Sequence, residues 1–304
     1  MKRIFLLIMF LISPFLICNA QDKIILTSDS VKLYVKVQGS GPVCLYIHGG
    51  PGAGSYSMEK FFGEYIEKYF TVIYLDQRGS GRSTSPKDGN YSVERILLDF
   101  EEVREFLGVE QWITLGHSFG GILQMAYINS YPKSIKGMLM LNCTLSFKDI
   151  LINSWIPKAR ELSNVEKKIL ITDSKDTILE ELFIAAKAMS EKGEGWKMSF
   201  NSKANYDLMN LSYDDISDFN YDFSSLALNI DDFWIDYRDL SSEIKVPVLF
   251  YYGTKDWNIG ENHYKGIKFP NMVLWGSETG HFPFIENIDD LVRAIDYFLD
   301  NYPL

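Results

Sequence analysis

A five-residue segment at positions 116–120 constrains the fold of this chain more than any other feature. It reads Gly-His-Ser-Phe-Gly and joins a short apolar run, 112–115, to a stretch of helical spacing, 120–131. A Gly-x-Ser-x-Gly segment between a strand and a helix forms a sharp turn that exposes the serine hydroxyl at the end of a sheet. Larger side chains on either side of the serine would collide with neighbouring elements, which explains the two glycines. We therefore predict a strand-turn-helix unit in which Ser118 is a nucleophile.

Short apolar runs alternate with stretches of helical spacing along much of the chain. The runs that fit buried strands span residues 43–47, 72–75, 112–115, 138–141, 248–252 and 272–275. The stretches that fit helices span residues 56–68, 93–107, 120–131 and 289–301. Such alternation is typical of a parallel sheet with helices on both faces. Two further runs, 23–27 and 31–37, flank a tight turn and predict an antiparallel hairpin at the sheet edge.

The apolar pattern changes between residues 145 and 241. The spacing there is helical, and no run fits a buried strand. The predicted fold class is therefore α/β, with a mostly parallel central sheet and flanking helices. We expect residues 21–144 and 242–304 to form this core and residues 145–241 to form an inserted helical cap.

The second half of the predicted cap is strongly acidic, because Lys203 and Arg238 are the only basic residues between 201 and 241. The same stretch holds nine aspartates: Asp207, Asp214, Asp215, Asp218, Asp222, Asp231, Asp232, Asp236 and Asp239. One interpretation is a solvated helical face whose aspartates cap short helices while aromatic rings pack inward. The other is a lid that presents carboxylates and rings to a cationic, apolar substrate.

The first twenty residues have the composition of a secretory signal peptide. Lys2 and Arg3 precede an apolar run at 4–17, and Ala20 supplies a small residue at a cleavage site. The run is too short to span a bilayer comfortably. We predict an exported protein with residues 1–20 removed and no stable membrane insertion, and the alternative is a lipid anchor at Cys18.

The formal net charge of −10 disfavours nucleic acid as a partner, because proteins that bind it need a basic face. It also disfavours anionic membrane surfaces. Two cysteines follow the predicted signal peptide, Cys44 and Cys143, and both lie in or beside apolar runs. We expect two buried free thiols rather than a disulfide, and neither cysteine has the spacing of a metal ligand.

A serine nucleophile needs a base, and the base needs an acid to orient it. His281 follows the predicted strand 272–275 through a loop and precedes an apolar patch. Asp256 follows the strand 248–252 in the same way. The order Ser118, Asp256, His281 is the order in which the α/β-hydrolase fold carries its triad. We therefore predict that these three residues are catalytic.

The chain has three other histidines, and we assign none of them to catalysis. His117 adjoins the nucleophile, and His48 lies in the loop His-Gly-Gly-Pro-Gly, so both are expected to be structural. His263 lies in a polar, helical stretch, 261–265, and is expected to be solvated.

The oxyanion of an acyl-transfer intermediate needs backbone N–H donors in a dry site. Phe119 supplies one at the start of the helix that follows the nucleophile. The loop after strand 43–47 should supply the other, and Gly50 is the predicted donor. A further glycine-rich segment, 76–83, lacks the spacing of a phosphate-binding loop and is expected to be a structural loop braced by Asp76 and Arg78.

Three segments together resemble the proline iminopeptidase group of α/β-hydrolases: HGGPG at 48–52, DQRGSGRS at 76–83 and GHSFGG at 116–121. The resemblance implies a helical cap over the site, hydrolysis of an amide or ester through an acyl-enzyme, and no cofactor. It also implies cap carboxylates that hold the free amino terminus of a substrate. The cap has no clear Trp-Glu segment of the kind the group uses there, and Phe119 replaces the tryptophan usual after the nucleophile.

Three functions fit these observations. The leading hypothesis is an exported aminopeptidase that removes an N-terminal residue, such as proline, from small peptides. The second is a carboxylesterase on small apolar esters, for which the rings of the cap matter and its aspartates do not. The third is a non-catalytic protein that binds a small molecule, although such proteins usually lack a triad member and none is missing here.

Overall fold

The computed structural model describes residues 21–166, 170, 172 and 174–304. The predicted signal peptide, residues 1–20, and the alternative lipidation site at Cys18 lie outside the described residues. None of the helices within the described ranges is long and apolar enough to cross a membrane.

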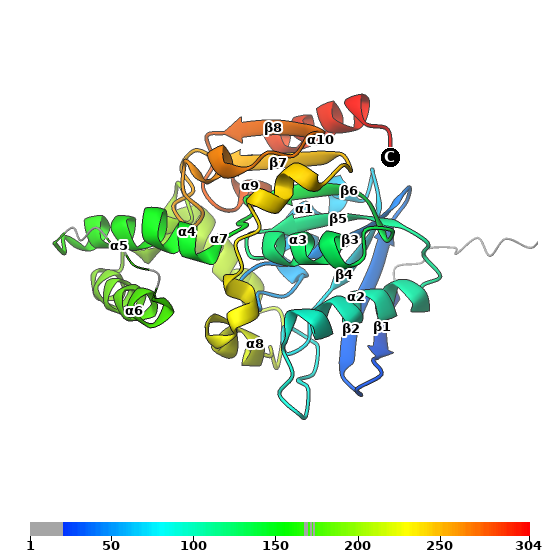
Figure 1. Cartoon of the computed structure of the whole chain (residues 1–304), viewed down its shortest axis with the longest axis horizontal. Coiled ribbons are helices and arrows are strands. Elements are labelled where there is room, and N and C mark those ends of the chain that lie inside the picture. The colour runs from blue at the N-terminus through cyan, green and yellow to red at the C-terminus, as the bar shows by residue number, and fades with distance from the viewer. Residues whose placement is uncertain (1–20, 167–169, 171, 173) are drawn as a thin grey trace, which may run out of the picture.

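The core is one eight-stranded sheet with the strand order β1-β2-β4-β3-β5-β6-β7-β8 (Figure 1). Strand β1 pairs antiparallel with β2, and β2 with β4, whereas every other neighbouring pair is parallel. The predicted parallel sheet and its antiparallel edge hairpin are therefore confirmed. The strands are β1 (Gln21–Leu26), β2 (Lys32–Gly39), β3 (Val43–Ile47), β4 (Thr71–Leu75), β5 (Trp112–His117), β6 (Ile135–Leu141), β7 (Val248–Gly253) and β8 (Met272–Ser277).

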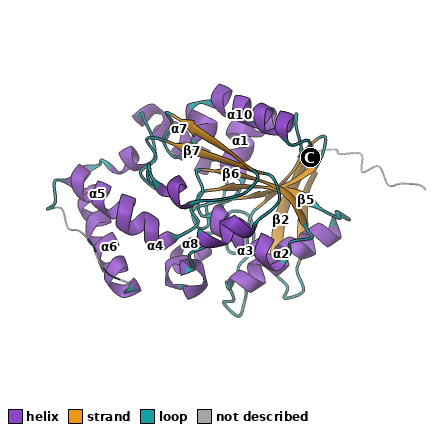
Figure 2. Ribbon diagram, turned by 45° about the horizontal axis from the view of Figure 1, so that its top comes forward, coloured by secondary structure: helices purple, strands orange, loops and turns teal. Residues whose placement is uncertain are grey.

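Helices cover both faces of the sheet, as Figure 2 shows. One face packs on α1 (Tyr56–Ile66) and α10 (Ile288–Asn301), and the other on α2 (Val93–Phe106) and α3 (Gly120–Ser130). Successive strand residues point to opposite faces, so both faces of the central strands are apolar. In β3, Cys44 and Tyr46 lie on the face that packs on α1 and α10, whereas Leu45 and Ile47 lie on the face that packs on α2 and α3.

Both predicted thiols, Cys44 and Cys143, are buried and free. Burial raises the pKa of each thiol, which keeps both protonated and unreactive at neutral pH. Cys143 lies two residues beyond the end of β6 rather than inside a strand.

The elements between β6 and β7 are helical turns and helices. They are α4 (Phe147–Ile150), η1 (Leu151–Trp155), α5 (Ile156–Ser163), α6 (Lys175–Lys192), η2 (Gly195–Met198), α7 (Lys203–Tyr213), α8 (Asp222–Leu226), η3 (Ala227–Asn229), η4 (Asp231–Trp234) and η5 (Asp239–Glu243). Helices α5 and α6 pack together at the end of the molecule opposite the C-terminus (Figure 1), where Arg160 and Glu181 form a buried ion pair. Among the described residues of this stretch, Asn220 alone forms a β-bridge, an isolated one with Gly81.

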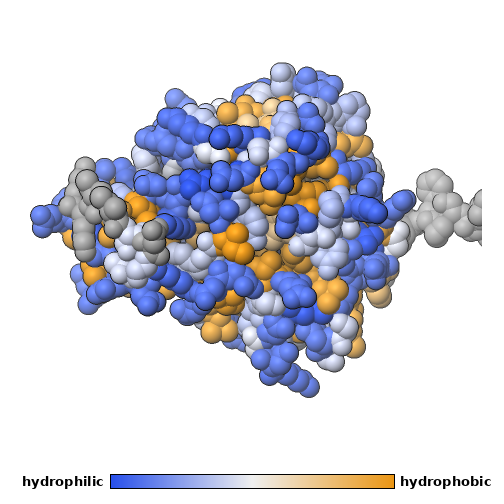
Figure 3. Space-filling view, viewed as in Figure 1, coloured by the Kyte–Doolittle hydropathy of each residue, from blue (hydrophilic) through white to orange (hydrophobic). Residues whose placement is uncertain are grey.

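All nine aspartates of the segment 201–241 are exposed. The rings Phe223 and Phe233 from the same segment are fully buried and contact the ring of Phe119. Hydrophilic residues likewise cover most of the face of the molecule seen in Figure 3, with hydrophobic side chains gathered near its centre. The structure therefore favours the solvated helical face over an acidic lid.

Candidate active site

Ser118 lies on the sharp turn between β5 and α3. Its φ is +55°, in the left-handed region that residues other than glycine seldom adopt, and such strain is common at catalytic positions. A Cβ at Gly116 would lie 2.0 Å from Oε1 of Gln124, and a Cβ at Gly120 would lie 2.3 Å from the carbonyl oxygen of Ile47. The structure thus gives the physical reason for both glycines of the segment.

Asp256 follows β7 and is buried, with 1% of its surface exposed. Its Oδ2 accepts a hydrogen bond from Nδ1 of His281 at 2.8 Å and another from Nδ2 of Asn142 at 2.8 Å. Its Oδ1 accepts from the backbone N–H groups of Asn258 at 3.0 Å and Ile259 at 3.2 Å. Both oxygens are therefore held in place by donors, and the fixed carboxylate keeps the Nδ1 edge of the His281 ring turned toward Asp256.

His281 and Ser118 line the same cavity, which has a volume of about 460 Å³. Because Nδ1 of His281 donates to Asp256, the ring has its Nε2 lone pair available to take the Ser118 proton. The structure thus brings the three predicted residues to the carboxyl ends of β5, β7 and β8, with Asp256 and His281 in contact. This arrangement has the parts needed for nucleophilic acyl transfer.

The two predicted oxyanion donors lie beside the nucleophile. Gly50 lines the cavity, whereas Phe119 does not; its ring stacks on that of the lining residue Phe147 at 5.4 Å between ring centroids. Among the hydrogen bonds of the described residues, none is donated by the backbone N–H of Gly50 or of Phe119. Both N–H groups are therefore available for a substrate oxygen.

The glycine-rich segment 76–83 is structural, as predicted. Asp76 accepts hydrogen bonds from the backbone N–H of Ser55 at 2.7 Å and from Nε of Arg82 at 2.7 Å. Burial alone would raise the pKa of Asp76, but its contacts with Arg82 lower it below the usual range. The fully buried Arg78 pairs with Asp99 at 2.7 Å. Through the contacts of Asp76 with Ser55 and of Gln77 with His48, the segment 76–83 holds both ends of the loop 48–55, which carries Gly50.

The two histidines expected to be structural are buried and hydrogen-bonded. Nε2 of His48 accepts from the backbone N–H of Gln77 at 3.0 Å, and burial lowers its pKa. Nε2 of His117 lies 2.8 Å from the carbonyl oxygen of His281 and can only donate to it. Burial, followed by the nearby His281 ring, lowers the pKa of His117 to about 3.

The depressed pKa of His117 should make the stability of the protein depend on pH. The unfolded chain protonates this ring near its ordinary pKa of 6.5, whereas the folded protein keeps it neutral down to about 3. The resulting stabilisation is complete above about pH 6.5 and is lost as the pH falls toward 3, up to about 5 kcal/mol. We expect urea unfolding of the His117→Gln variant to show a shallower loss of stability over this range. The same pH dependence in both proteins would contradict this assignment.

The cavity that holds Ser118 is lined mainly by apolar and aromatic side chains. Its walls come from the core and from α4, η1, α6, α7, α8 and η3 of the stretch between β6 and β7. The lining residues are Tyr46, Gly49, Gly50, Pro51, Ala53, Ser57, His117, Ser118, Thr144, Phe147, Ile150, Leu151, Trp155, Leu182, Met209, Tyr213, Ser224, Leu228, Asn258, Ile259, His281 and Phe282. This set contains no aspartate, glutamate, lysine or arginine. None of the nine exposed aspartates therefore reaches the site.

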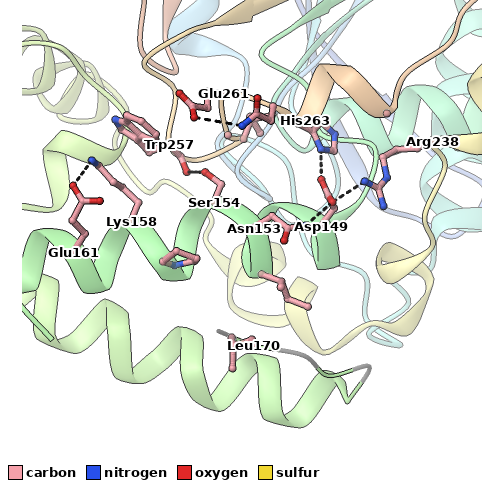
Figure 4. Close-up of a pocket in the computed structure, with 16 residues that line it drawn as sticks. Asp149, Asn153, Ser154, Lys158, Glu161, Leu170, Arg238, Trp257, Glu261 and His263 are labelled. Atoms are coloured by element: carbon pink, nitrogen blue, oxygen red, sulfur yellow. Dashed lines mark hydrogen bonds and ion pairs between the residues drawn. The ribbon is translucent and has the colours of Figure 1, made fainter. Parts of the chain in front are cut away.

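A second cavity of about 520 Å³ lies beside α5 (Figure 4). It shares only Ile259 with the first. It contains neither Ser118 nor His281. Two pairs of its charged groups form ion pairs: Lys158 with Glu161 at 2.8 Å and Arg238 with Asp149 at 2.7 Å. Although this cavity is the larger, none of the three predicted catalytic residues lines it, so the cavity with Ser118 is the candidate active site.

His263 lies at the edge of the second cavity, and the prediction that it is solvated is wrong. Its ring is buried, with Nδ1 donating to Asp149 at 2.8 Å and Nε2 accepting from the backbone N–H of Leu145 at 3.0 Å. Asp149 also pairs with Arg238, as Figure 4 shows. The polar neighbours of His263 gave no sign of this burial. The residue begins a short 3₁₀ turn, η6 (His263–Gly266), and its ring contacts Leu145 and Asp149, which follow β6 in the sequence.

Two functional residues were missed by the sequence interpretation. Asn142, which holds Asp256, follows the apolar run of β6 directly. The rule that identified Asp256, a polar residue at the carboxyl end of a strand, applies to it equally. Asn258, which lines the cavity and donates its backbone N–H to Asp256, has no comparable sequence signal because its place depends on the turn after β7.

The chain matches known proteins over most of its length. The family model described as alpha/beta hydrolase fold matches residues 42–288. The chain is 26% identical over 287 residues to a proline iminopeptidase from Saccharolobus solfataricus, a match that covers 88% of each protein. It is 34% identical over 118 residues to a proline iminopeptidase from Neisseria meningitidis, a match that covers 37% of each. The predicted resemblance to this group is confirmed.

Solved structures show the same fold. A proline iminopeptidase-related protein from Thermus thermophilus superposes with a TM-score of 0.78 at 21% identity, covering 93% of this chain and 98% of that one. An esterase from Exiguobacterium antarcticum superposes with a TM-score of 0.68 at 20% identity, covering 92% and 100%. At such identities the likeness concerns the fold alone. With the family match, these findings establish that the chain belongs to the alpha/beta hydrolase fold family.

Proposed function

We propose that this protein is a serine hydrolase that cleaves small, uncharged and largely apolar carboxylic esters through an acyl-enzyme at Ser118. The observation that carries the proposal is the lining of the cavity around Ser118, which is mainly apolar and aromatic and contains no aspartate, glutamate, lysine or arginine. A buried ion without a partner is costly, so such walls favour a neutral substrate. The alpha/beta hydrolase fold itself is shared by several hydrolytic activities, and the site rather than the fold selects among them.

The residues act in two half-reactions. His281 takes the Ser118 proton through Nε2 while Oγ attacks the ester carbonyl, and Asp256 stabilises the imidazolium that forms. The N–H groups of Gly50 and Phe119 bind the oxyanion. His281 then protonates the leaving alcohol, and the acyl group stays on Ser118. Water, deprotonated by His281, hydrolyses the acyl-enzyme and restores the free serine.

An aminopeptidase is the second candidate, and the family comparison favours it. The relative from Saccharolobus solfataricus, which matches over 88% of both chains, carries the name proline iminopeptidase. An enzyme that recognises a free amino terminus needs a carboxylate at that position, and no such group lines the cavity. We therefore rank this activity below ester hydrolysis.

A matched panel of substrates separates the two candidates. We expect p-nitrophenyl esters of short acyl chains to be cleaved with a kcat/KM at least 100-fold above that for a prolyl p-nitroanilide. We also expect N-acetylation of the prolyl amide to change its rate by less than about threefold, because no carboxylate in the cavity distinguishes the charged amine. A prolyl amide that is cleaved faster than the esters, and only when its amine is free, would establish the aminopeptidase instead.

The exposed aspartates supply a control for this panel. Asp207 lies on α7 and pairs with Lys203 at the surface. Asp207→Asn should leave the kcat/KM values of all substrates unchanged. A selective loss of prolyl amide cleavage in this variant would show that the acidic segment binds the amine and would overturn the ranking.

We also propose that the protein is exported. The basic start, the apolar run at 4–17 and Ala20 support this. Cell fractionation should place the protein outside the cytoplasm with an N-terminus at Gln21, and a protein found only in the cytoplasm with Met1 retained would contradict export.

A further inference from the structure

A short segment of the inserted stretch lies between the two loops that carry Asp256 and His281. The carbonyl oxygen of Ser199 accepts a hydrogen bond from the backbone N–H of His281 at 2.6 Å. The Ser199 hydroxyl accepts another from Nδ2 of Asn258 at 2.6 Å, two residues after Asp256. The carbonyl oxygen of Met198 accepts from the N–H of Trp257 at 3.1 Å. The acid loop and the histidine loop are therefore both tied to the same piece of backbone.

Glu286 completes this connection from the other side. It is the last residue of α9 (Pro283–Glu286), five positions after His281. Its Oε2 accepts the backbone N–H of Gly280, the residue directly before His281. Its Oε1 accepts the backbone N–H of Asn201 at 2.6 Å, and Oε2 also accepts Nδ2 of Asn201 at 3.2 Å. One carboxylate thus fastens the histidine loop to the segment 198–201.

The space around this contact is tight. A Cβ at Gly280 would lie 2.4 Å from the carbonyl oxygen of Ser199 and 3.2 Å from Oε2 of Glu286. The ring of Phe200 also stacks on that of Phe282 at 4.7 Å between centroids. The backbone next to His281 therefore has little freedom to move while Glu286 keeps its three hydrogen bonds.

The charge of Glu286 is compensated by backbone dipoles. Within the described part of the chain no ion pair includes Glu286. Burial and the nearby charge of Asp256 raise the pKa of its carboxyl, and the N–H groups of Asn201 and Gly280 oppose that rise. A carboxylate can accept at both oxygens, whereas a glutamine at this position has one acceptor and would present an NH₂ group to the other N–H.

We propose that Glu286 is a positioning residue for the hydrolysis: it holds the backbone on both sides of the histidine loop so that His281 stays aligned between Asp256 and Ser118. It acts through Gly280 and the segment 198–201 and does not line the cavity itself. The role rests on the proposed function of Ser118 as the nucleophile. It predicts that a change outside the substrate cavity slows the chemistry without weakening substrate binding.

The test compares Glu286→Gln with Glu278→Gln in the full chain. Glu278 lies on the same loop, but its side chain is 86% exposed and makes only a long contact with Lys255. Active sites are counted from the burst of a p-nitrophenyl ester, so that kcat is expressed per active site. We expect Glu286→Gln to lower this kcat by 10- to 100-fold with KM changed less than about twofold, and Glu278→Gln to match the wild type. A misplacement of the general base has consequences of this order.

A merely structural role would give a different result. It would lower the melting temperature and the number of active sites but leave kcat per site unchanged, and that outcome overturns the proposal. If Glu286→Gln does not fold, Asn201→Ala decides, because it removes the Nδ2 contacts to Glu286 and to the carbonyl oxygen of Glu278 and leaves the backbone contact to Glu286. We expect a 3- to 10-fold lower kcat for Asn201→Ala, and an unchanged kcat overturns the proposal. Reaction of the wild type with a fluorophosphonate tests the proposed hydrolase function separately from the role of Glu286. An unreactive Ser118 would refute the hydrolase function, whereas a reactive Ser118 with an unchanged kcat in the variants would refute only the positioning role of Glu286.

Discussion

Replacing Ser118 with alanine should lower the kcat for ester hydrolysis by about 10⁵-fold or more. In the proposed reaction the hydroxyl forms the covalent bond to the acyl group, and no other described serine lies on a turn held at the carboxyl end of β5. Losses of this size are typical when the nucleophile of a triad is removed, and they correspond to about 7 kcal/mol of transition-state stabilisation. Long incubations with a p-nitrophenyl ester, corrected for spontaneous hydrolysis of the ester, measure the residual rate of the variant.

The matched control is Ser225→Ala. Ser225 lies on α8, is exposed and donates to the carbonyl oxygen of Tyr221. This variant should retain the wild-type kcat and KM. If Ser118→Ala kept more than a hundredth of the wild-type rate, the nucleophile would have to be another group.

The second large effect is expected for Asp256→Asn, which should lower kcat by about 10⁴-fold. The backbone N–H groups of Asn258 and Ile259 point at the Oδ1 position, so they hold the amide oxygen of the new asparagine there. Its NH₂ group then faces Nδ1 of His281. The ring must accept at Nδ1 and carry its proton on Nε2, the wrong tautomer for taking a proton from Ser118.

Asn142 makes the same substitution costly for a second reason. Its Nδ2 donates to Oδ2 of Asp256 and to the carbonyl oxygen of Gly280, while its Oδ1 is buried without a partner. In the variant, the NH₂ group of the new asparagine would face that of Asn142. Asn142 could avoid this only by turning its amide, which would break its hydrogen bond to the carbonyl oxygen of Gly280. The control is Asp300→Asn on the exposed face of α10, which should behave as the wild type. A loss below tenfold for Asp256→Asn would contradict the role of Asp256 as the orienting acid.

Much of the core could be predicted because its signals are local. Short apolar runs such as 43–47 and 248–252 are typical of buried strands, and the structure has them as β3 and β7. The glycines on both sides of Ser118 are typical of a sharp turn between a strand and a helix. The sequence spacing also placed Asp256 and His281 at strand ends, where a parallel sheet brings them together. Strand and helix bounds differ by one to a few residues, since end turns depend on tertiary contacts.

The contacts around the triad could not be predicted in the same way. Glu286 and Asn201 are separated by 85 positions, and nothing in the polar stretch around Asn201 marks it as a neighbour of the histidine loop. His263 likewise lies in a polar stretch, yet its ring is buried on Asp149, 114 positions away. Such contacts depend on how the inserted stretch packs on the core, and periodicity carries no information about that packing.

The interpretation of the acidic segment 201–241 is the one that the structure alters most. Nine aspartates at 201–241 left open a lid that binds a cationic substrate, and this idea supported the aminopeptidase. In the fold they face solvent, whereas the rings between them pack inward on Phe119. None of these aspartates lines the cavity around Ser118, and its mainly apolar lining is the reason that we rank ester hydrolysis above peptide hydrolysis as the proposed activity.

The most direct test of the account is covalent labelling with a fluorophosphonate, followed by peptide mapping of the adduct. The reagent phosphonylates a serine only when a neighbouring base activates it. We expect one adduct per chain, located on Ser118, absent from Ser118→Ala and formed far more slowly in Asp256→Asn. An unlabelled folded protein, or an adduct on a different residue, would contradict the assignment of Ser118, His281 and Asp256 as the catalytic triad.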